Sequence, residues 1–364
     1  MIHPDSRTIE WMKQVAAENK FSDLVLIEKS IRAFSLLESL VLSGCPFLFK
    51  GGTALMLHLD STKRLSIDID IICPPETNLE KYLHKYAHEY GFGNVKLVER
   101  INVHNVPKTH AKFFYLVSYV TNTETEFILL DVLFEDIHYH EIEEVPIQSR
   151  FLKTQGEPVK VKVPGKADML GDKLTAFAPN TTGIPYFKKG KDCSMEIIKQ
   201  LFDIASLFDV TDNLAVTSKT FKKFAKVELQ YRNLDPENIV QVLDDIYQTS
   251  LSICLKGQVQ PDNFSVLQTG IKRIQSFIHS EKYNIDSAII NASKAAYLSV
   301  LIANGVTEIF RFDTQNMEHL RDAVIREPLP TKLNKLKKTN VEAFFYWNEI
   351  EKILNSKKQE SLER

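Results

Sequence analysis

The first clear pattern of apolar residues lies between residues 22 and 42. Apolar side chains recur there at steps of three and four residues, which is the period of one face of an α-helix. Pro46 then breaks the pattern. The sequence therefore predicts a helix that buries one face, carried by Leu24, Ile27, Ile31, Phe34, Leu37 and Val41.

A short apolar run follows and ends in two glycines. Phe47–Phe49 precedes Gly51 and Gly52, as expected for a buried strand that enters a tight turn. Thr53 can cap a helix that continues through Leu57. The pattern therefore predicts a strand, a glycine turn and a helix in direct succession.

Acidic and apolar residues alternate over residues 66–73. Because successive side chains of a strand point to opposite faces, Asp68 and Asp70 are expected on one face and the isoleucines between them on the other. The alternation therefore predicts a strand that presents two neighbouring carboxylates.

The rest of the chain divides into two parts with different periods. Residues 78–90 favour a helix and three strand-like runs follow, whereas helical spacing dominates after Val163. We therefore predict an α+β fold with a mixed-sheet domain over 1–163, a mainly helical domain over 164–354, and a polar tail over 355–364 that frays. The strand-like runs cover 95–103, 112–121 and 126–134, and the helical segments cover 166–177, 195–208, 218–231, 236–251 and 262–280, with shorter segments to the end.

Composition agrees with a folded protein of ordinary kind. The 364 residues suffice for two domains, and 44% hydrophobic with 25% charged residues is near the average of globular proteins. The formal net charge of -2 argues against a uniformly basic surface. Any contact with a nucleic acid must therefore be local.

The cysteines and the apolar segments bear on the cellular compartment. The four cysteines are scattered without a C-x-x-C pair, which argues against a zinc ribbon and against a disulfide framework. The N-terminal residues lack the basic start and apolar stretch of a secretory signal, and no apolar run approaches the length of a membrane span. We therefore expect a cytoplasmic protein that does not bind a membrane.

The glycine pair and three aspartates together predict a site for a nucleoside triphosphate and Mg²⁺, or Mn²⁺ in its place. Gly51 and Gly52 allow phosphate oxygens to approach backbone N–H groups at a helix N-terminus. Asp68 and Asp70 are separated by about 7 Å of strand rise and can share metal ions. Asp131 lies inside an apolar run, where a carboxylate is expensive to bury without a cation or another partner. Each feature alone also fits a structural role, and their order along the chain favours the site.

This order of elements resembles the polymerase-β-like nucleotidyltransferase superfamily. Residues 47–73 are similar to one branch of it, the AbiEii/AbiGii-type nucleotidyltransferases of bacterial abortive-infection and toxin–antitoxin systems, whose first motif reads K-G-G-T-A-L and then R-x-S-x-D-x-D. The resemblance implies that Asp68, Asp70 and Asp131 hold the metal. It also implies that the nucleotide is bound by Lys50, Gly51, Gly52, Thr53, Arg64 and Ser66, where Arg64 fixes either a phosphate or the loop that carries the two aspartates.

Two further matches lie in the predicted helical domain, so that the resemblance covers about residues 47–208. Lys173 matches the lysine of a K-L-x-A element, and Asp203 matches the last acid of an R-D-x-x-D element. Lys199 and Gln200 stand where that element has arginine and its first aspartate, so their part is open. The resemblance implies that Lys173 contacts the triphosphate. It implies that Asp203, in the same active site, orients Lys173 or takes the proton from the acceptor hydroxyl.

Three functions fit these residues. The resemblance implies transfer of a nucleoside monophosphate to a hydroxyl on RNA, with the 3′ end of a tRNA as the expected acceptor, by a toxin that has a cognate antitoxin. The same site can serve nucleotidylation or phosphorylation of a hydroxyl on a protein or a small molecule. A catalytically inactive nucleotide-binding module is the third reading, and the presence of all three carboxylates and both glycines counts against it.

Other polar clusters are interpreted as parts of the surface. His84 and His88 are four apart on a predicted helix, but the residues between them lack the glutamate of a metalloprotease site. His138 and His140 are interpreted as part of a loop at a strand end, because no third ligand stands at a recognised spacing.

Two groups of lysines can contact an RNA backbone. The first consists of Lys332, Lys335, Lys337 and Lys338. The second is the segment 186–191, where aromatic side chains beside lysines can stack on a base. We favour the second, because it lies between the two matched motifs of the helical domain.

Overall fold

The computed structural model describes residues 1–19, 23–59, 63–99, 108–118, 124–278, 281–315 and 317–362. The chain divides into two compact units. The first contains Met1–Gly165 and Ser276–Lys282, and the second contains Lys166–Gln275 and Tyr283–Arg364.

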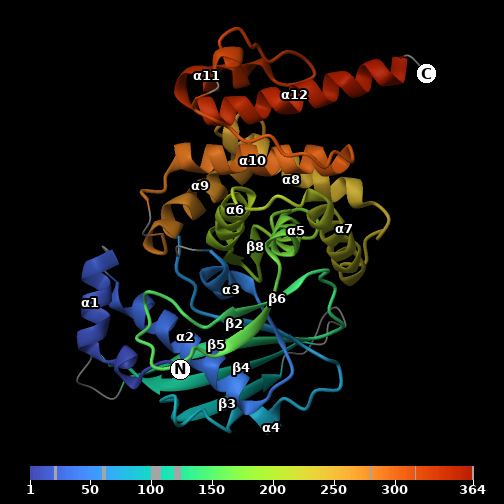
Figure 1. The fold of residues 1–364 in the computed structure, drawn as a ribbon. Coiled ribbons are helices and arrows are strands. Elements are labelled where there is room, and N and C mark those ends of the chain that lie inside the picture. The colour runs from blue at the N-terminus through green and yellow to red at the C-terminus, as the bar shows by residue number, and fades with distance from the viewer. Residues whose placement is uncertain are drawn as a thin grey trace. The chain divides into compact units, whose positions relative to one another are not determined.

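The first unit is built on a five-stranded mixed sheet, shown in Figure 1. The strand order is β1-β2-β5-β4-β3, in which β2 and β5 run parallel and the other neighbours run antiparallel. The mixed sheet expected from the sequence is therefore confirmed. The strands are β1 (Leu48–Lys50), β2 (Ile69–Cys73), β3 (Asn94–Glu99), β4 (Lys108–Leu116) and β5 (Thr125–Phe134).

Helix α2 packs against the sheet at β2 and β5. Three of its charged residues are buried together with its apolar ones: Glu28 pairs with Arg32 at 3.2 Å, and Glu38 accepts a hydrogen bond from the Tyr90 hydroxyl at 2.6 Å. Burial and the bond to Glu38 raise the pKa of Tyr90. The predicted single apolar face is therefore only part of the buried surface of α2. The helices of this unit are η1 (Pro4–Arg7), α1 (Ile9–Asn19), α2 (Leu24–Ser43), α3 (Gly51–His58) and α4 (Glu80–Leu83).

A two-stranded ribbon, absent from the sequence prediction, adds to this unit. Strands β6 (Ile142–Pro146) and β7 (Lys160–Pro164) pair antiparallel, with β7 beside β1 and β6 beside α3. The His58 ring joins the helix to the ribbon through its Nε2, which lies 2.7 Å from the Pro164 carbonyl oxygen. The ribbon therefore fixes the far end of the helix that follows the glycine turn.

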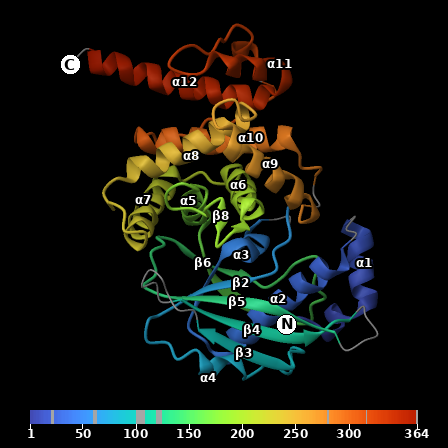
Figure 2. The same cartoon turned by 180° about the vertical axis from the view of Figure 1, so that it is seen from behind.

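The second unit is mainly helical, with α5 packed on α6 and α7, and α10 packed on α6, α8 and α12 (Figure 2). Within the described residues, α10 is the one helix long and apolar enough to cross a membrane, although 72% of its apolar window is buried in this unit. The expectation that no run approaches that length was therefore wrong. The elements are α5 (Lys166–Ala176), β8 (Phe187–Lys188), β9 (Lys191–Asp192), α6 (Ser194–Phe208), α7 (Leu214–Tyr231), α8 (Ile239–Cys254), α9 (Pro261–Arg273), η2 (Ile274–Ser276), α10 (Ile285–Ala303), η3 (Glu318–Leu320), η4 (Thr331–Lys335), α11 (Leu336–Thr339) and α12 (Val341–Leu362).

Several element boundaries differ from the prediction. The helix expected over 78–90 is limited to α4, and turns follow it. The apolar side chains of these turns are buried all the same, so their spacing resembled that of a helix. The segments after residue 280 are not short, since α10 and α12 have 19 and 22 residues. The polar tail 355–364 does not fray from its first residue, because α12 continues to Leu362.

The division of the chain into two units also differs from the sequence prediction at two places. The first unit ends at Gly165, where the sequence indicated residue 163. The segment Ser276–Lys282 was assigned to the helical domain but belongs to the first unit, because its backbone pairs with the segment before β2. Residues 100–107 and 119–123, which include the ends of two predicted strands, lie outside the described residues.

Candidate active site

One row of residues crosses four neighbouring strands of the sheet. Lys50 on β1 is the register partner of Asp70 on β2, Asp70 is the partner of Asp131 on β5, and Asp131 is the partner of His110 on β4. Register partners on adjacent strands emerge on the same face of a sheet. The structure therefore brings Asp70 and Asp131 side by side, with a lysine at one end of the row and a histidine at the other.

The glycine turn lies directly against this row. Gly51 has φ +82°, and a Cβ built on it would overlap the Asp70 carboxylate and lie 2.9 Å from its Cγ. A Cβ on Gly52 would lie 2.7 Å from Arg64 Nη2 and 2.9 Å from Ser66 Oγ. The two glycines therefore allow three polar side chains of the second half of the motif to approach the turn.

Thr53 has a different task from the one expected. Helix α3 already begins at Gly51, with Lys50 as its N-cap residue and no side-chain cap, so Thr53 lies inside the first turn. Its hydroxyl donates to the backbone oxygen of Asp68 at 2.6 Å. The expectation that Thr53 caps the helix was therefore wrong, and the hydroxyl holds the segment before β2.

Asp68 itself lies outside the strand. Strand β2 begins at Ile69, so the alternation predicted over 66–73 holds only from that residue onward. Asp68 is exposed, whereas Asp70 is half-buried. The bond from Thr53, rather than the strand pleat, positions the backbone of Asp68.

Arg64 is buried, with 7% of its surface exposed. Its Nη1 donates to the Leu65 carbonyl oxygen at 3.0 Å, and its backbone forms an isolated bridge with Ile278. The Leu65 N–H donates to the Phe277 carbonyl oxygen at 2.8 Å. The returning segment 276–282 thus fixes the loop that carries Arg64.

His110 is a candidate site residue that the sequence did not reveal. Its Nδ1 contacts Oδ1 of Asp131, and its side chain is only 6% exposed. Its buried Nε2 has no hydrogen-bond partner among the described residues. A single histidine in a strand gives no local signal of function, because only the register of β4 with β5 brings it to Asp131.

Lys173 and Asp203 meet inside the second unit. The Lys173 ammonium lies 2.9 Å from Asp203 Oδ2, and the two side chains are 10% and 3% exposed. Lys173 Nζ also donates to Gln200 Oε1 at 3.0 Å. Gln200 and Asp203 are three residues apart on α6 and so share one face. The glutamine at the position of the motif's first aspartate therefore binds the lysine without adding a second negative charge.

The donor atoms of the sheet row fit a magnesium ion that is bound together with a nucleotide. Among the residues that the structure describes, no three His, Cys, Asp or Glu side chains form a preassembled metal cage. Mg²⁺ is commonly held by one or two carboxylates, with waters and substrate phosphates as its other ligands. The pair formed by Asp70 and Asp131 matches that requirement.

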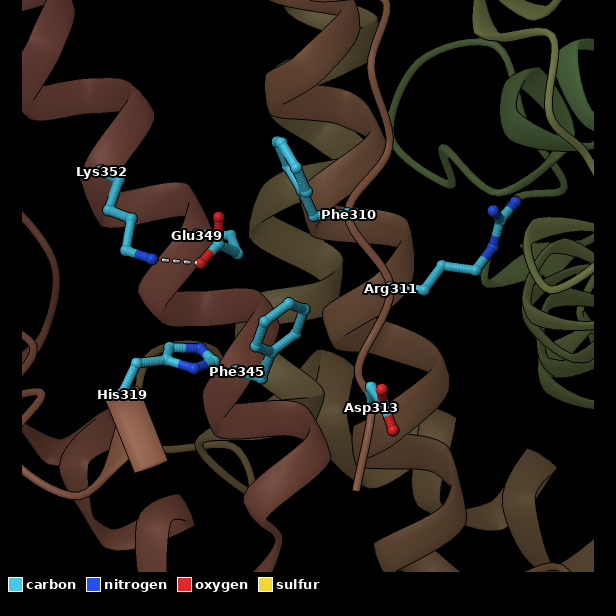
Figure 3. Close-up of a pocket in the computed structure, with 7 residues that line it drawn as sticks. All are labelled: Phe310, Arg311, Asp313, His319, Phe345, Glu349 and Lys352. Carbon is cyan, nitrogen blue, oxygen red and sulfur yellow. Dashed lines mark hydrogen bonds and ion pairs between the residues drawn. The ribbon is translucent and has the colours of Figure 1, made fainter. Parts of the chain in front are cut away.

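A pocket of about 320 Å³ lies elsewhere in the helical unit and contains none of the predicted site residues (Figure 3). The Arg311 guanidinium points away from it and donates to the Phe208 carbonyl oxygen at 2.8 Å. The pocket is lined by Phe310, Arg311, Asp313, His319, Phe345, Glu349 and Lys352.

Comparison with known protein families identifies a relationship over most of the chain. The model of a family described as "Nucleotidyl transferase AbiEii toxin, Type IV TA system" matches residues 35–276. This range contains the sheet row, the glycine turn and the cluster around Lys173. No curated protein matches the chain. The family suggested by the sequence motifs is confirmed, over a longer range than those motifs covered.

The contact between Gly51 and Asp70 makes a prediction about stability. Gly51→Ala should lower the free energy of unfolding by roughly 1–2 kcal/mol for the positive φ and by about 1–3 kcal/mol more for the overlap with the carboxylate. Adding Asp70→Ala should relieve most of the second part and none of the first, because it removes the Oδ2 and Cγ atoms that the new methyl group would overlap and leaves only the Cβ at 3.1 Å. Thermal and denaturant unfolding of the two single variants and the double variant measure this coupling.

Gly44 provides a matched control for this cycle. It has the same φ of +82°, and a Cβ built on it meets no atom within 4 Å. Gly44→Ala should therefore show the strain of the backbone alone and no coupling to Asp70→Ala. Equal losses at Gly44 and Gly51, with no recovery in the double variant, would contradict the assigned contact.

Proposed function

The chain belongs to the AbiEii family of nucleotidyl transferase toxins of type IV toxin–antitoxin systems, and on this basis we propose that it transfers a nucleoside monophosphate from an NTP to a hydroxyl on RNA, with the 3′ end of a tRNA as the acceptor. The family implies a nucleotide substrate and a cognate antitoxin. The observation that best supports the proposal is the register of β2 with β5, which places Asp70 beside Asp131 next to the glycine turn.

The glycine turn would bind the phosphates of the nucleotide. The first N–H groups of a helix have no acceptor within the helix, and in α3 they belong to Gly51, Gly52 and Thr53. Such groups favour phosphate oxygens, both as hydrogen-bond donors and through the helix dipole. Lys50, at the end of the row, adds a positive charge close to the same turn.

Asp70 and Asp131 would hold a divalent cation, with the exposed Asp68 as a further carboxylate beside the strand. A bound Mg²⁺ supplies neutralisation of the charge that develops on the phosphate oxygens during transfer. The chain's own contribution is to keep the two carboxylates in register and the turn close to them.

The Lys173 cluster would serve the same reaction by contacting the triphosphate. An ammonium beside the departing pyrophosphate offsets its growing negative charge. Of the two tasks that the motif offers Asp203, orientation of Lys173 is the better supported, because its carboxylate is buried and already paired with that ammonium.

The first test identifies the reaction. The full chain should be incubated with each labelled NTP, Mg²⁺, and total cellular RNA or protein, and we expect label in the RNA fraction. Asp70→Asn keeps the shape of the side chain but removes its charge, so it should reduce transfer by at least about 10²-fold. Asp212→Asn changes a carboxylate that is 92% exposed and should transfer normally.

The outcome of that test separates the three functions. Label on a protein or on a small molecule would redirect the proposal to that acceptor. Failure to label any fraction with any NTP would instead favour the inactive binding module. Normal transfer by Asp70→Asn would refute the assigned site.

The buried pair of Lys173 and Asp203 requires a double variant to separate folding from catalysis. Lys173→Met or Asp203→Leu alone should destabilise the protein by about 3–5 kcal/mol, because each breaks the ion pair and keeps the other charge buried. The double variant should recover most of this loss, since neither buried charge remains. Its transfer activity should stay at least about 10²-fold below wild type. Recovery of both stability and activity would make the pair purely structural.

His110 should act as a positioning residue for Asp131. His110→Asn keeps an N–H group near the place of Nδ1, whereas His110→Leu removes it. The leucine variant should need about 10–100-fold more Mg²⁺ for half-maximal transfer, which is the usual effect of losing a group that orients a metal ligand. The asparagine variant should stay close to wild type. Mn²⁺ binding measured by calorimetry in the presence of nucleotide gives a second readout, and equal behaviour of both variants would contradict this role.

A further inference from the structure

The hairpin formed by β8 and β9 has an unusual turn. Its two strands are joined by Lys189 and Gly190, which have φ of +50° and +75°. Both values lie in the left-handed region that a two-residue hairpin of type I′ requires. Asparagine or aspartate is the favoured first residue of such a turn, and a lysine there adds strain of roughly 1–2 kcal/mol. The turn therefore carries a lysine at a cost to its own stability.

The neighbouring side chains add two more unfavourable features. Lys188 and Lys191 are direct register partners across the two strands, and like charges in that position repel each other. Phe187 leaves 58% of its surface exposed. All three lysines of the tip are exposed as well. None of these features helps the hairpin to fold, and such conflicts concentrate at functional sites.

The base of the hairpin is firmly held within the second unit. Asp192 accepts from the Ser194 N–H at 2.7 Å and pairs with Arg273 at 2.6 Å. The Cys193 N–H donates to the Tyr186 carbonyl oxygen at 3.0 Å. The chain then enters α6, the helix that carries Asp203, and both views show β8 beside α6 (Figures 1 and 2). The tip is therefore presented by a fixed support.

The loop before the hairpin is fixed in the same way. The buried Asp245 on α8 accepts from the Asn180 N–H at 2.8 Å and from the Thr181 hydroxyl at 2.8 Å. Desolvation by burial raises the pKa of Asp245. The segment that leads from α5 to β8 is thus anchored to the helical core before the chain reaches the tip.

The chemistry of the tip selects a particular kind of ligand. Three ammonium groups attract a polyanion, and an exposed aromatic ring beside them offers a surface on which a base can stack. The chain as a whole has a net charge of -2, so this positive group is local. An anionic membrane would also attract the lysines, but a single exposed phenylalanine buries little apolar area in a bilayer. A single-stranded nucleic acid uses both features at once.

We propose that the β8–β9 hairpin is an RNA-binding arm, in which Phe187 stacks on an unpaired base and Lys188, Lys189 and Lys191 contact the phosphates on either side of it. The inference deepens the proposed function, since it assigns residues to the capture of a single-stranded RNA acceptor. It does not depend on turnover, because binding can be measured without an NTP.

The test compares matched variants of the full chain in binding a fluorescent single-stranded 12-nucleotide RNA, measured by anisotropy over a range of salt concentrations. Changing the three hairpin lysines to glutamine should weaken binding. It should also make the negative slope of log K against log salt less steep by roughly 2, since each phosphate contact on a single strand releases about 0.7 counterion. The control changes Lys332, Lys335 and Lys338 to glutamine, which removes the same charge from the other exposed lysine group. The control should bind RNA as wild type does.

The aromatic ring is tested separately from the charge. Phe187→Ala should weaken RNA binding by roughly 5- to 100-fold with an unchanged salt slope, which corresponds to the loss of one stacked base. Phe187→Tyr keeps a ring and should restore most of the affinity. Circular dichroism and thermal unfolding should be unaffected in both variants, because the side chain is largely exposed.

Each result bears on the proposal independently of catalysis. Asp70→Asn should bind the RNA normally, so a protein that binds RNA through the hairpin but transfers nothing would support this inference and not the proposed function. Wild-type affinity in the hairpin variants, or loss of affinity in the control alone, would overturn the inference. Failure of the wild type to bind RNA would also overturn it. Binding instead to phosphatidylserine vesicles through the same residues would identify a membrane surface as the ligand.

Discussion

The candidate active site depends on one pairing, the parallel register of β2 with β5. That register places Asp70 opposite Asp131, although like charges in such positions repel each other. The opposite face of the same two strands holds it in place, because Ile69 pairs with Leu130 and Ile71 with Val132, all at most 2% exposed. A slip of one residue would turn this apolar set toward solvent. Packing on one face of the sheet therefore enforces the close approach of two carboxylates on the other.

Neighbouring residues of the first unit compensate for the repulsion between the two carboxylates. Lys50 and His110 occupy the two ends of the row, so each carboxylate has a neighbour that can be cationic or can donate a hydrogen bond. Gly51 gives the Asp70 carboxylate room that any other residue would fill. These contacts come from four strands and one turn, so the site is assembled only when those four strands have paired. The motif is a short segment of the sequence, but the candidate site also requires pairings with β5 and β4, which lie farther along the chain.

The sequence predicted those parts of the structure that have a local pattern. Apolar spacing indicated α2, β5, α5 and α6, and the order of the motif indicated Asp70 and Asp131. Local patterns do not encode long-range register, which is why His110 was missed although it contacts Asp131. The same limit explains the unpredicted ribbon of β6 and β7, and the return of Ser276–Lys282 to the first unit. Asp68 was placed in a strand because alternation was read as pleating, whereas a hydrogen bond from Thr53 sets its position.

Lysine shows most clearly what a sequence alone leaves open. Lys173 and Lys189 lie on either side of one loop, yet the first is buried against Asp203 and the second stands exposed at a strained turn. A buried ammonium must be paired, so its partners fix its position. Such a fixed ammonium is suited to contact with one phosphate at one place. Exposed ammonium groups repel one another, keep their hydration, and suit a flexible polyanion that approaches from solvent. The buried and the exposed lysine lie in the same unit and are the same type of residue. Their different burial agrees with the roles that we propose for them, contact with the nucleotide for Lys173 and capture of a long acceptor for Lys189.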